Sequence, residues 1–294
     1  MLVVRDLNKT IDKQVVLRNV NFKLMPGQVV GVVGRNGTGK TTLFKTMAGV
    51  LTPDSGTVEY EGESIYSSPG NKMNIVFIPD SPEALLNYTA MDSAQLFSRV
   101  YPFFDRDYFK ETLHRLELPH NRKIRQFSKG MRMMFSIALG LSTKAQYILL
   151  DEPTNGIDII ANKQITKLLM EAAEEGTTLV ISSHMLGELE RIADTILLMK
   201  DGAIETHSIT DATNGAICKF QVVFREEAPT VWLKSPSVHV LDRVGRVYTV
   251  LVDTKAQISI LEEMGKFNPL LMEPLPMKLE DLFVWKLGGR KHVD

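Results

Sequence analysis

The sequence has one cysteine, almost no excess charge and no long apolar run, and each scarcity excludes a class of protein. Because Cys218 is the one cysteine in 294 residues, neither an intramolecular disulfide nor a cysteine-only metal cluster can form, which fits a reducing cytosol. The formal net charge of -1 gives no electrostatic reason to expect nucleic acid as the main partner. No apolar run approaches the roughly 20 residues that cross a bilayer, and Met1 to Arg5 has the pattern of a strand rather than of a signal peptide.

The remaining composition is that of an ordinary globular protein. Hydrophobic residues make up 44% of the chain and charged residues 23%, which is enough to build a sizeable core. The length suggests one large domain or two unequal ones, and the sequence pattern changes near residue 210. We therefore expect a first domain over residues 1–210 and a small α+β accessory domain over 211–294, in which the sequence shows no recognisable chemistry.

A glycine-rich segment stands between an apolar strand and a helix. The apolar run from Val29 to Val33 precedes it, and a helical pattern opens at Thr42. Glycines allow successive backbone N–H groups to converge on an anion, and the helix N-terminus adds unpaired donors and a positive dipole end. In this context the spacing predicts a phosphate-binding loop with Lys40 on the β/γ-phosphates, the Thr41 hydroxyl on Mg²⁺ and Thr42 near another phosphate oxygen. The residues of the loop are Gly34, Arg35, Asn36, Gly37, Thr38, Gly39, Lys40 and Thr41.

Polar side chains also end two later apolar strands. Asp151 and Glu152 follow the run from Tyr147 to Leu150, and His184 follows the run from Thr177 to Ser183. The carboxyl ends of strands in a parallel sheet face the ligand. We therefore expect Asp151 in the Mg²⁺ shell, Glu152 polarising the attacking water and His184 in contact with the γ-phosphate.

Residues 84 to 141 carry a helical pattern that interrupts an alternation of strands and helices. Pro102 and Pro119 separate three apolar stripes, and Ser128 stands at the N-cap of the third helix. Outside this block we expect strands at residues 2–4, 15–24 (broken near Asn19), 29–33, 57–60, 74–79, 147–150, 177–183, 195–199 and 203–205, and helices from 42 and at 159–175. In the accessory domain we expect strands at 218–225 and 243–253, a helix at 255–264 and a last short helix around Leu279.

These motifs, in this order and spacing, resemble the ATP-binding subunit of an ABC transporter. The stretch from Phe127 to Met131 is similar to the family's signature, Asn155 to Asp158 resembles its D-loop, and His184 matches its switch histidine. The tail is similar to the C-terminal domain of the bacterial multidrug- and bacitracin-export type subunits. The resemblance implies an α/β fold with a P-loop NTPase (RecA-like) core, an inserted helical subdomain at about 84–141, antiparallel β elements and a small α+β C-terminal domain.

The resemblance also implies a mechanism. Two such chains face each other head to tail, so that ATP on the phosphate loop of one is capped by Ser128 and Gly130 of the other. Lys129, which replaces a small signature glycine, either helps to hold that ATP or points to solvent. ATP closes the dimer, whether with an identical or a different second subunit, and hydrolysis reopens it. The helical block would dock on an integral membrane permease, which holds the chain at the inner face of the membrane and, from the type of tail, drives export. ATP and Mg²⁺ are the implied cofactors.

Two positions depart from the family's pattern. Counting back from Val20-Asn21-Phe22, the aromatic residue that stacks on adenine falls at Ile11, so we expect weaker or less base-selective binding. The glutamine that touches Mg²⁺ and senses the membrane partner falls at Asp80. An aspartate can still ligate Mg²⁺, directly or through water, so the metal set becomes Thr41, Asp151 and Asp80.

Two other functions compete with the transporter. One is a soluble ABC-type ATPase that acts on translation or DNA repair, although the chain has a single cassette without a charged linker, and a compact helical block. The other is a regulatory cassette with weak hydrolysis. Glu152 and His184 argue against the second alternative, whereas Ile11 and Asp80 keep it open.

Overall fold

The computed structural model describes residues 1–184, 186–208, 217–225, 228–229, 235, 237–278, 281 and 285. The chain divides into two compact units, one formed by Met1–Met185 with Ile192–Thr206 and the other by Leu186–Arg191 with His207–Asp294. Within the described part, no helix is both long and apolar enough to cross a membrane.

A six-stranded sheet forms the centre of the first unit. Its strand order is β10-β9-β3-β8-β7-β6, and the pairs from β9 through β6 are parallel. Such a sheet is covered on both faces, which explains why its strands are almost continuous apolar runs. As a result, the carboxyl ends of β3, β7 and β8 lie at one edge of the sheet. The strands are β3 (Val29–Val33), β6 (Ile75–Ile78), β7 (Tyr147–Asp151), β8 (Thr178–Ser183), β9 (Thr195–Lys200) and β10 (Ala203–Ser208).

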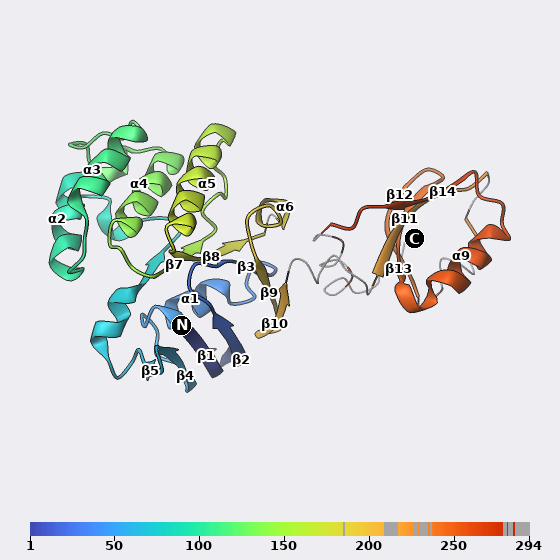
Figure 1. The fold of residues 1–294 in the computed structure, drawn as a ribbon, viewed down its shortest axis with the longest axis horizontal. Helices are drawn as coiled ribbons and strands as arrows, with labels where there is room; N and C mark the ends of the chain where they lie inside the picture. The colour runs from blue at the N-terminus through green and yellow to red at the C-terminus, as the bar shows by residue number, and fades with distance from the viewer. Residues whose placement is uncertain are drawn as a thin grey trace. The chain divides into compact units, whose positions relative to one another are not determined.

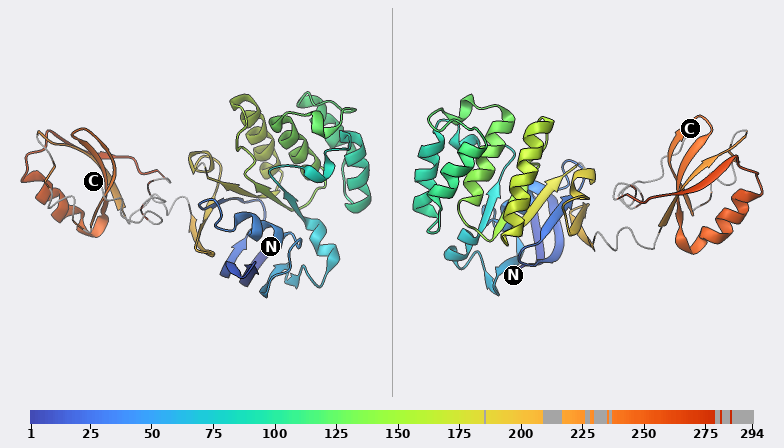
Figure 2. Two further views of the ribbon diagram at one scale, coloured as in Figure 1. Left: turned by 180° about the vertical axis from the view of Figure 1, so that it is seen from behind. Right: turned by 45° about the horizontal axis from the view of Figure 1, so that its top comes forward.

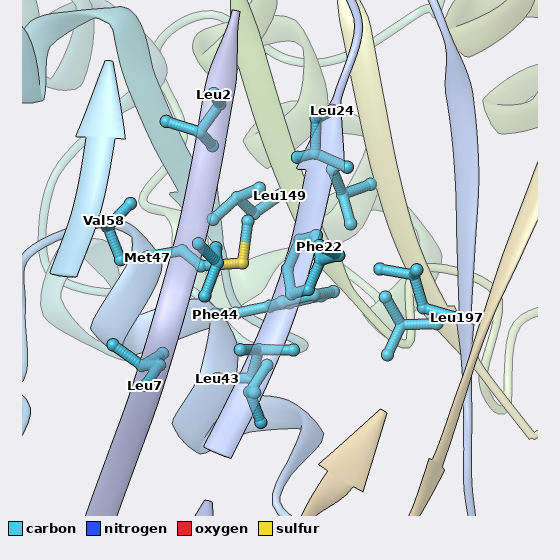
Figure 3. Close-up of a cluster of buried hydrophobic side chains, with 14 of the residues drawn as sticks. Leu2, Leu7, Phe22, Leu24, Leu43, Phe44, Met47, Val58, Leu149 and Leu197 are labelled. Atoms are coloured by element: carbon cyan, nitrogen blue, oxygen red, sulfur yellow. The ribbon is translucent and has the colours of Figure 1, made fainter. Parts of the chain in front are cut away.

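A second, antiparallel sheet covers one face of this centre together with helix α1 (Lys40–Met47) (Figure 1). Its order is β2-β1-β4-β5, from β1 (Leu2–Ile11), β2 (Gln14–Leu24), β4 (Ser55–Tyr60) and β5 (Glu63–Ser64). The irregularity expected near Asn19 is present within β2. Asn19 has a φ of 45°, and the pairing of β2 with β1 shifts register there. The strand expected at residues 2–4 continues to Ile11, because its polar outer residues do not interrupt the pairing with β2. Figure 3 shows apolar side chains of both sheets and α1 packed in one buried cluster.

Four helices lie on the other face of the six-stranded sheet (Figures 1 and 2). Three of them form the expected helical block, and the side chains of Thr89, Asp105 and Ser128 cap their N-termini. The helices are α2 (Ala90–Val100), α3 (Arg106–Arg115), α4 (Lys129–Leu141) and α5 (Ile159–Glu174). Shorter helices are α6 (Leu186–Leu189) and the 3₁₀ turns Pro69–Asn74, Glu83–Leu85, Ile124–Gln126 and Thr254–Ala256.

The second unit contains a four-stranded sheet in the order β12-β13-β11-β14. Its elements are β11 (Ile217–Val223), β12 (Val238–Val244), β13 (Val247–Asp253), β14 (Leu271–Leu275) and helix α9 (Gln257–Gly265). The single strand expected at 243–253 is wrong, since Gly245 with φ of 61° turns the chain between β12 and β13. Strand β14 was not expected, and the helix expected around Leu279 lies largely outside the described residues.

A largely buried ion pair connects Asp281 to this sheet. Lys219 Nζ lies 2.8 and 2.9 Å from the two carboxylate oxygens of Asp281, and the two side chains are 12% and 8% exposed. Lys219 faces Leu251 on the neighbouring strand, and Leu251 faces His239 on the next. The ring of His239 in turn contacts Trp285. Asp281 and Trp285 therefore lie on the sheet face opposite the cluster that includes Ile260 and Met264 of α9.

Replacing Lys219 by Met should destabilise the second unit by about 3 kcal/mol, because the buried carboxylate of Asp281 would lose its counter-charge and keep only the amide of Lys278 as a described side-chain partner. The double variant Lys219→Met/Asp281→Leu should recover most of that loss, and Lys255→Met, at an exposed lysine, should change little. Urea unfolding of the full chain measures this, since both tryptophans, Trp232 and Trp285, belong to the second unit. A double variant that is as unstable as the single one would contradict the assignment.

Candidate functional site

The glycine-rich loop joins β3 to α1, and its backbone requires glycine at two positions. Gly37 and Gly39 have φ values of 82° and 104°, and a Cβ on Gly39 would come within 2.8 Å of a Val16 methyl carbon. Gly39 is the N-cap of α1, so the helix begins at Lys40, two residues earlier than expected. The amides of Gly37, Gly39 and Lys40 donate to no described residue. The loop therefore offers the free N–H groups that bind phosphate at a helix N-terminus.

Lys40 lies inside the loop rather than on the surface. Its side chain is 7% exposed, and Nζ lies 3.4 Å from Oε1 of Glu152. The same ammonium donates to the carbonyl oxygens of Gly34 at 2.9 Å and of Arg35 at 3.4 Å. The fold thus fixes one buried cation between the loop and the end of β7, where a phosphate would meet a charge that is already desolvated.

Asp151 is the buried carboxylate that connects three elements of the sheet edge. It is 6% exposed. Its Oδ2 accepts from the Thr41 hydroxyl of α1 at 2.5 Å, and its Oδ1 accepts from the Ser182 hydroxyl of β8 at 2.8 Å. The Thr41 and Asp151 oxygens are the hard ligands that Mg²⁺ prefers.

Glu152 stands at the next position in an unusual conformation. Its φ of 50° is rare for a residue other than glycine and has to be held by its surroundings. Two contacts hold it: the amide donates to Ser182 Oγ at 2.9 Å, and Oε2 lies 2.5 Å from Nδ1 of His184. The structure thus brings together Lys40, Glu152 and His184, as the sequence indicated.

Ser182 is the residue of this site that the sequence analysis missed. One hydroxyl donates to Asp151 and accepts from the amide of Glu152, so it orients both acidic residues from the neighbouring strand. A serine at the end of an apolar strand gives little signal by itself. The register of β7 on β8, which pairs Asp151 with Ser182, could have revealed it.

The signature residues form a separate site. Ser128 Oγ accepts from the amide of Met131 at 3.2 Å, and Gly130 is buried at a place where a Cβ would come within 3.2 Å of Ala161. The exposed side chain of Lys129 lies over Gly156. A Cβ added to Gly156 would come within 3.1 Å of Lys129 Nζ. Among the described residues, no hydrogen bond or ion pair joins these three to the phosphate loop.

The two unusual positions lie at the edges of the site. Ile11 is 37% exposed and ends β1 just before a tight turn. Asp80 is exposed in the loop after β6 and lines a groove between this loop, α2 and α4. In the described part of the chain, no hydrogen bond joins Asp80 to Thr41 or Asp151, so its place in the metal set stays a prediction.

Comparisons with known proteins agree with this geometry. The family model described as ABC transporter matches residues 17–155. The chain is 32% identical to the ABC transporter ATP-binding protein YtrB of Bacillus subtilis over 99% of both chains. It belongs to the family of ABC transporter ATP-binding proteins. It is therefore an ATPase subunit with an α/β cassette fold, and it binds ATP.

Two further relatives support this assignment. The Bacillus licheniformis protein named bacitracin transport ATP-binding protein BcrA is 29% identical, with 97% of this chain and 96% of the relative covered. A solved structure described as an ATP-binding subunit of an ABC transporter superposes with a TM-score of 0.66 at 25% identity, covering 72% of this chain and 91% of that one. Membership of the family and the predicted fold class are thus confirmed.

The variant Ser182→Ala should lower kcat for ATP hydrolysis by about tenfold, because the loss of one hydroxyl removes a hydrogen bond from Asp151 and another from the strained backbone of Glu152. The KM for ATP should change much less, since the loop predicted to bind the phosphates is unchanged. Steady-state ATPase assays measure kcat and KM separately. Ser142→Ala, which removes a buried hydroxyl bonded to the Ala138 carbonyl, is the control, and an equal effect of both variants would contradict this role.

Proposed function

We propose that this subunit drives a separate membrane permease for export by closing on ATP as a head-to-tail dimer and reopening after hydrolysis. The observation that carries the proposal is the contact of Lys40 and His184 with the two oxygens of Glu152, which assembles a phosphate cation and a candidate base at one point. The relation to the bacitracin transport ATP-binding protein BcrA supports export. The proposed architecture is a cassette over residues 1–210 and an accessory domain over 211–294.

Hydrolysis in this proposal depends on positioning and charge. The loop amides and Lys40 hold the phosphates, Glu152 orients the attacking water, and His184 contacts the γ-phosphate. Thr41 and Asp151 would hold Mg²⁺, with Asp80 as a third ligand. Bound there, the ion would neutralise charge on the β- and γ-phosphates.

The signature residues are proposed to act on the ATP of the second subunit. Ser128, Lys129 and Gly130 have no bond to the phosphate loop of their own chain in the described part. They are the N-cap and the first two residues of α4. A helix N-terminus attracts phosphate, and the exposed ammonium of Lys129 adds charge. An ATP that touches both subunits only in the closed dimer shifts the population towards closure.

A groove in the helical block is the proposed contact with the permease. It has a volume of about 640 Å³ and lies between the loop after β6, helix α2 and helix α4. Its lining is mostly apolar, as expected for a surface that receives a partner helix. Asp80 lines the groove and follows a strand of the catalytic sheet, so a partner there would contact a segment that leads to the ATP site. The lining residues include Phe77, Pro79, Asp80, Glu83, Leu96 and Phe97.

The variant Glu152→Gln should lose at least about 100-fold in hydrolysis rate but still bind ATP, and it should accumulate as an ATP-dependent dimer. Lys40→Ala should lose nucleotide binding, because the buried phosphate cation is gone. Size-exclusion chromatography with and without ATP, together with ATPase assays, measures both. Glu174→Gln, at an exposed carboxylate of α5, is the control, and a Glu152→Gln protein that hydrolyses at the wild-type rate would refute the proposal.

The variant Leu96→Asp should reduce recovery of the chain with membranes, because it puts a charge into the apolar groove. Leu96 is 42% exposed, so the fold and the ATPase rate of the isolated chain should persist. The measurement is quantitative purification from gently solubilised membranes, in which the wild type should carry a polytopic membrane protein in near-equal amount. Val50→Asp, at a position 64% exposed outside the groove, serves as the matched control, and equal recovery of both variants would exclude the groove.

A further inference from the structure

One segment of the chain carries basic residues and no acidic ones. From Leu118 to Leu150 there are six Lys and Arg residues and no Asp or Glu, although the whole chain has a formal net charge of -1. Three of the six lie in and just before the 3₁₀ turn Ile124–Gln126. We call Arg122, Lys123 and Arg125 the basic turn.

The side chains of the basic turn are free to interact with a partner. All three are exposed, and no ion pair joins any of them to a described residue. Their charges are therefore not used to hold the fold. Three exposed cations in a stretch of sequence without acidic residues produce a local positive potential even on a protein that is neutral overall. The nearby carboxylate of Asp92 is bonded to Thr89, the residue that pairs with Lys123.

The backbone beneath these side chains is firmly held. The amide of Ile124 donates to Tyr88 O, and the amide of Arg125 donates to Leu86 O, each at 2.9 Å. On the other side, the guanidinium of Arg132 in α4 donates to the carbonyl oxygens of Arg125 at 2.7 Å and of Ile124 at 3.3 Å. The three charges thus project from a preorganised support.

The basic turn also borders the groove proposed for the permease. Its hydrogen-bond partners, Leu86 and Tyr88, directly follow the segment from Val76 to Leu85 that lines the groove. With the permease in the groove, the basic turn would lie on the side of the chain that is turned towards the membrane. The cytoplasmic leaflet carries anionic headgroups that attract Lys and Arg clusters.

We propose that the basic turn is a docking surface for anionic lipid headgroups, which adds a direct membrane contact to the one made through the permease. The argument that the basic turn is turned towards the membrane rests on the proposed function, but its binding to lipid does not. Each cation contributes about fivefold to partition onto an anionic surface at low ionic strength, so three contribute about 100-fold. The attraction fades with added salt, because the Debye length shortens.

The test is flotation of the full chain with vesicles of pure phosphatidylglycerol or pure phosphatidylcholine. The wild type should float with phosphatidylglycerol at low salt, should not float with phosphatidylcholine, and should dissociate as salt is added. The triple variant Arg122→Gln/Lys123→Gln/Arg125→Gln should lose about 100-fold in partition. The matched control Lys23→Gln/Lys163→Gln/Lys167→Gln removes three exposed charges elsewhere and should stay close to the wild type.

The outcomes separate this inference from the proposed function. A wild type that stays off phosphatidylglycerol, a basic-turn variant that floats as well as the wild type, or equal losses in the two triple variants would each overturn lipid docking. A basic-turn variant that keeps lipid binding but loses ATP-dependent dimerisation would overturn it too and assign the surface to the second subunit. ATP hydrolysis should be unchanged in both triple variants, because neither changes a residue of the ATP site, and it reports on the proposed function independently.

Discussion

The first unit depends on the burial of one carboxylate. A charge as buried as that of Asp151 is tolerated only when each oxygen has a partner, and those partners come from Thr41 at the start of α1 and Ser182 at the end of β8. Ser182 reaches it because β8 pairs with β7, and Thr41 reaches it from the helix that follows β3. The register of β7 on β8 and the position of the phosphate loop thus satisfy this carboxylate, and the same contacts create the site.

The sequence revealed the parts of this arrangement whose signal is local. The spacing of the loop, the acidic end of β7, the histidine after β8 and the cap at Ser128 each follow from neighbouring residues. What it did not reveal depends on contacts between distant segments. The role of Ser182 needs the strand register, the start of α1 at Lys40 needs the left-handed Gly39, and the turn at Gly245 lies within an alternating pattern that is equally typical of one long strand.

The helical block separates two tasks in space. The N-terminus of α4 presents Ser128 and Gly130, whose packing against α5 fixes the signature close to the segment that follows Glu152. Further along α4, Leu139 and Gly140 line the groove. In the proposed cycle a single rigid helix therefore touches both the ATP of the second subunit and the permease, so a small rotation of the block changes both contacts together.

The contact between Lys40 and Glu152 explains how the proposed cycle links binding to hydrolysis. The ammonium of Lys40 donates to two backbone carbonyl oxygens and lies 3.4 Å from Oε1 of Glu152. Glu152 is thus held by a cation on one oxygen and by His184 on the other. Phosphate oxygens are stronger acceptors than backbone carbonyls, so bound ATP draws Lys40 towards itself. Glu152 then loses its nearest cation and becomes available to orient water, while the hydroxyl of Ser182 still fixes its backbone. In the proposed cycle, the residue that recognises the phosphates is thus also the one that releases the base.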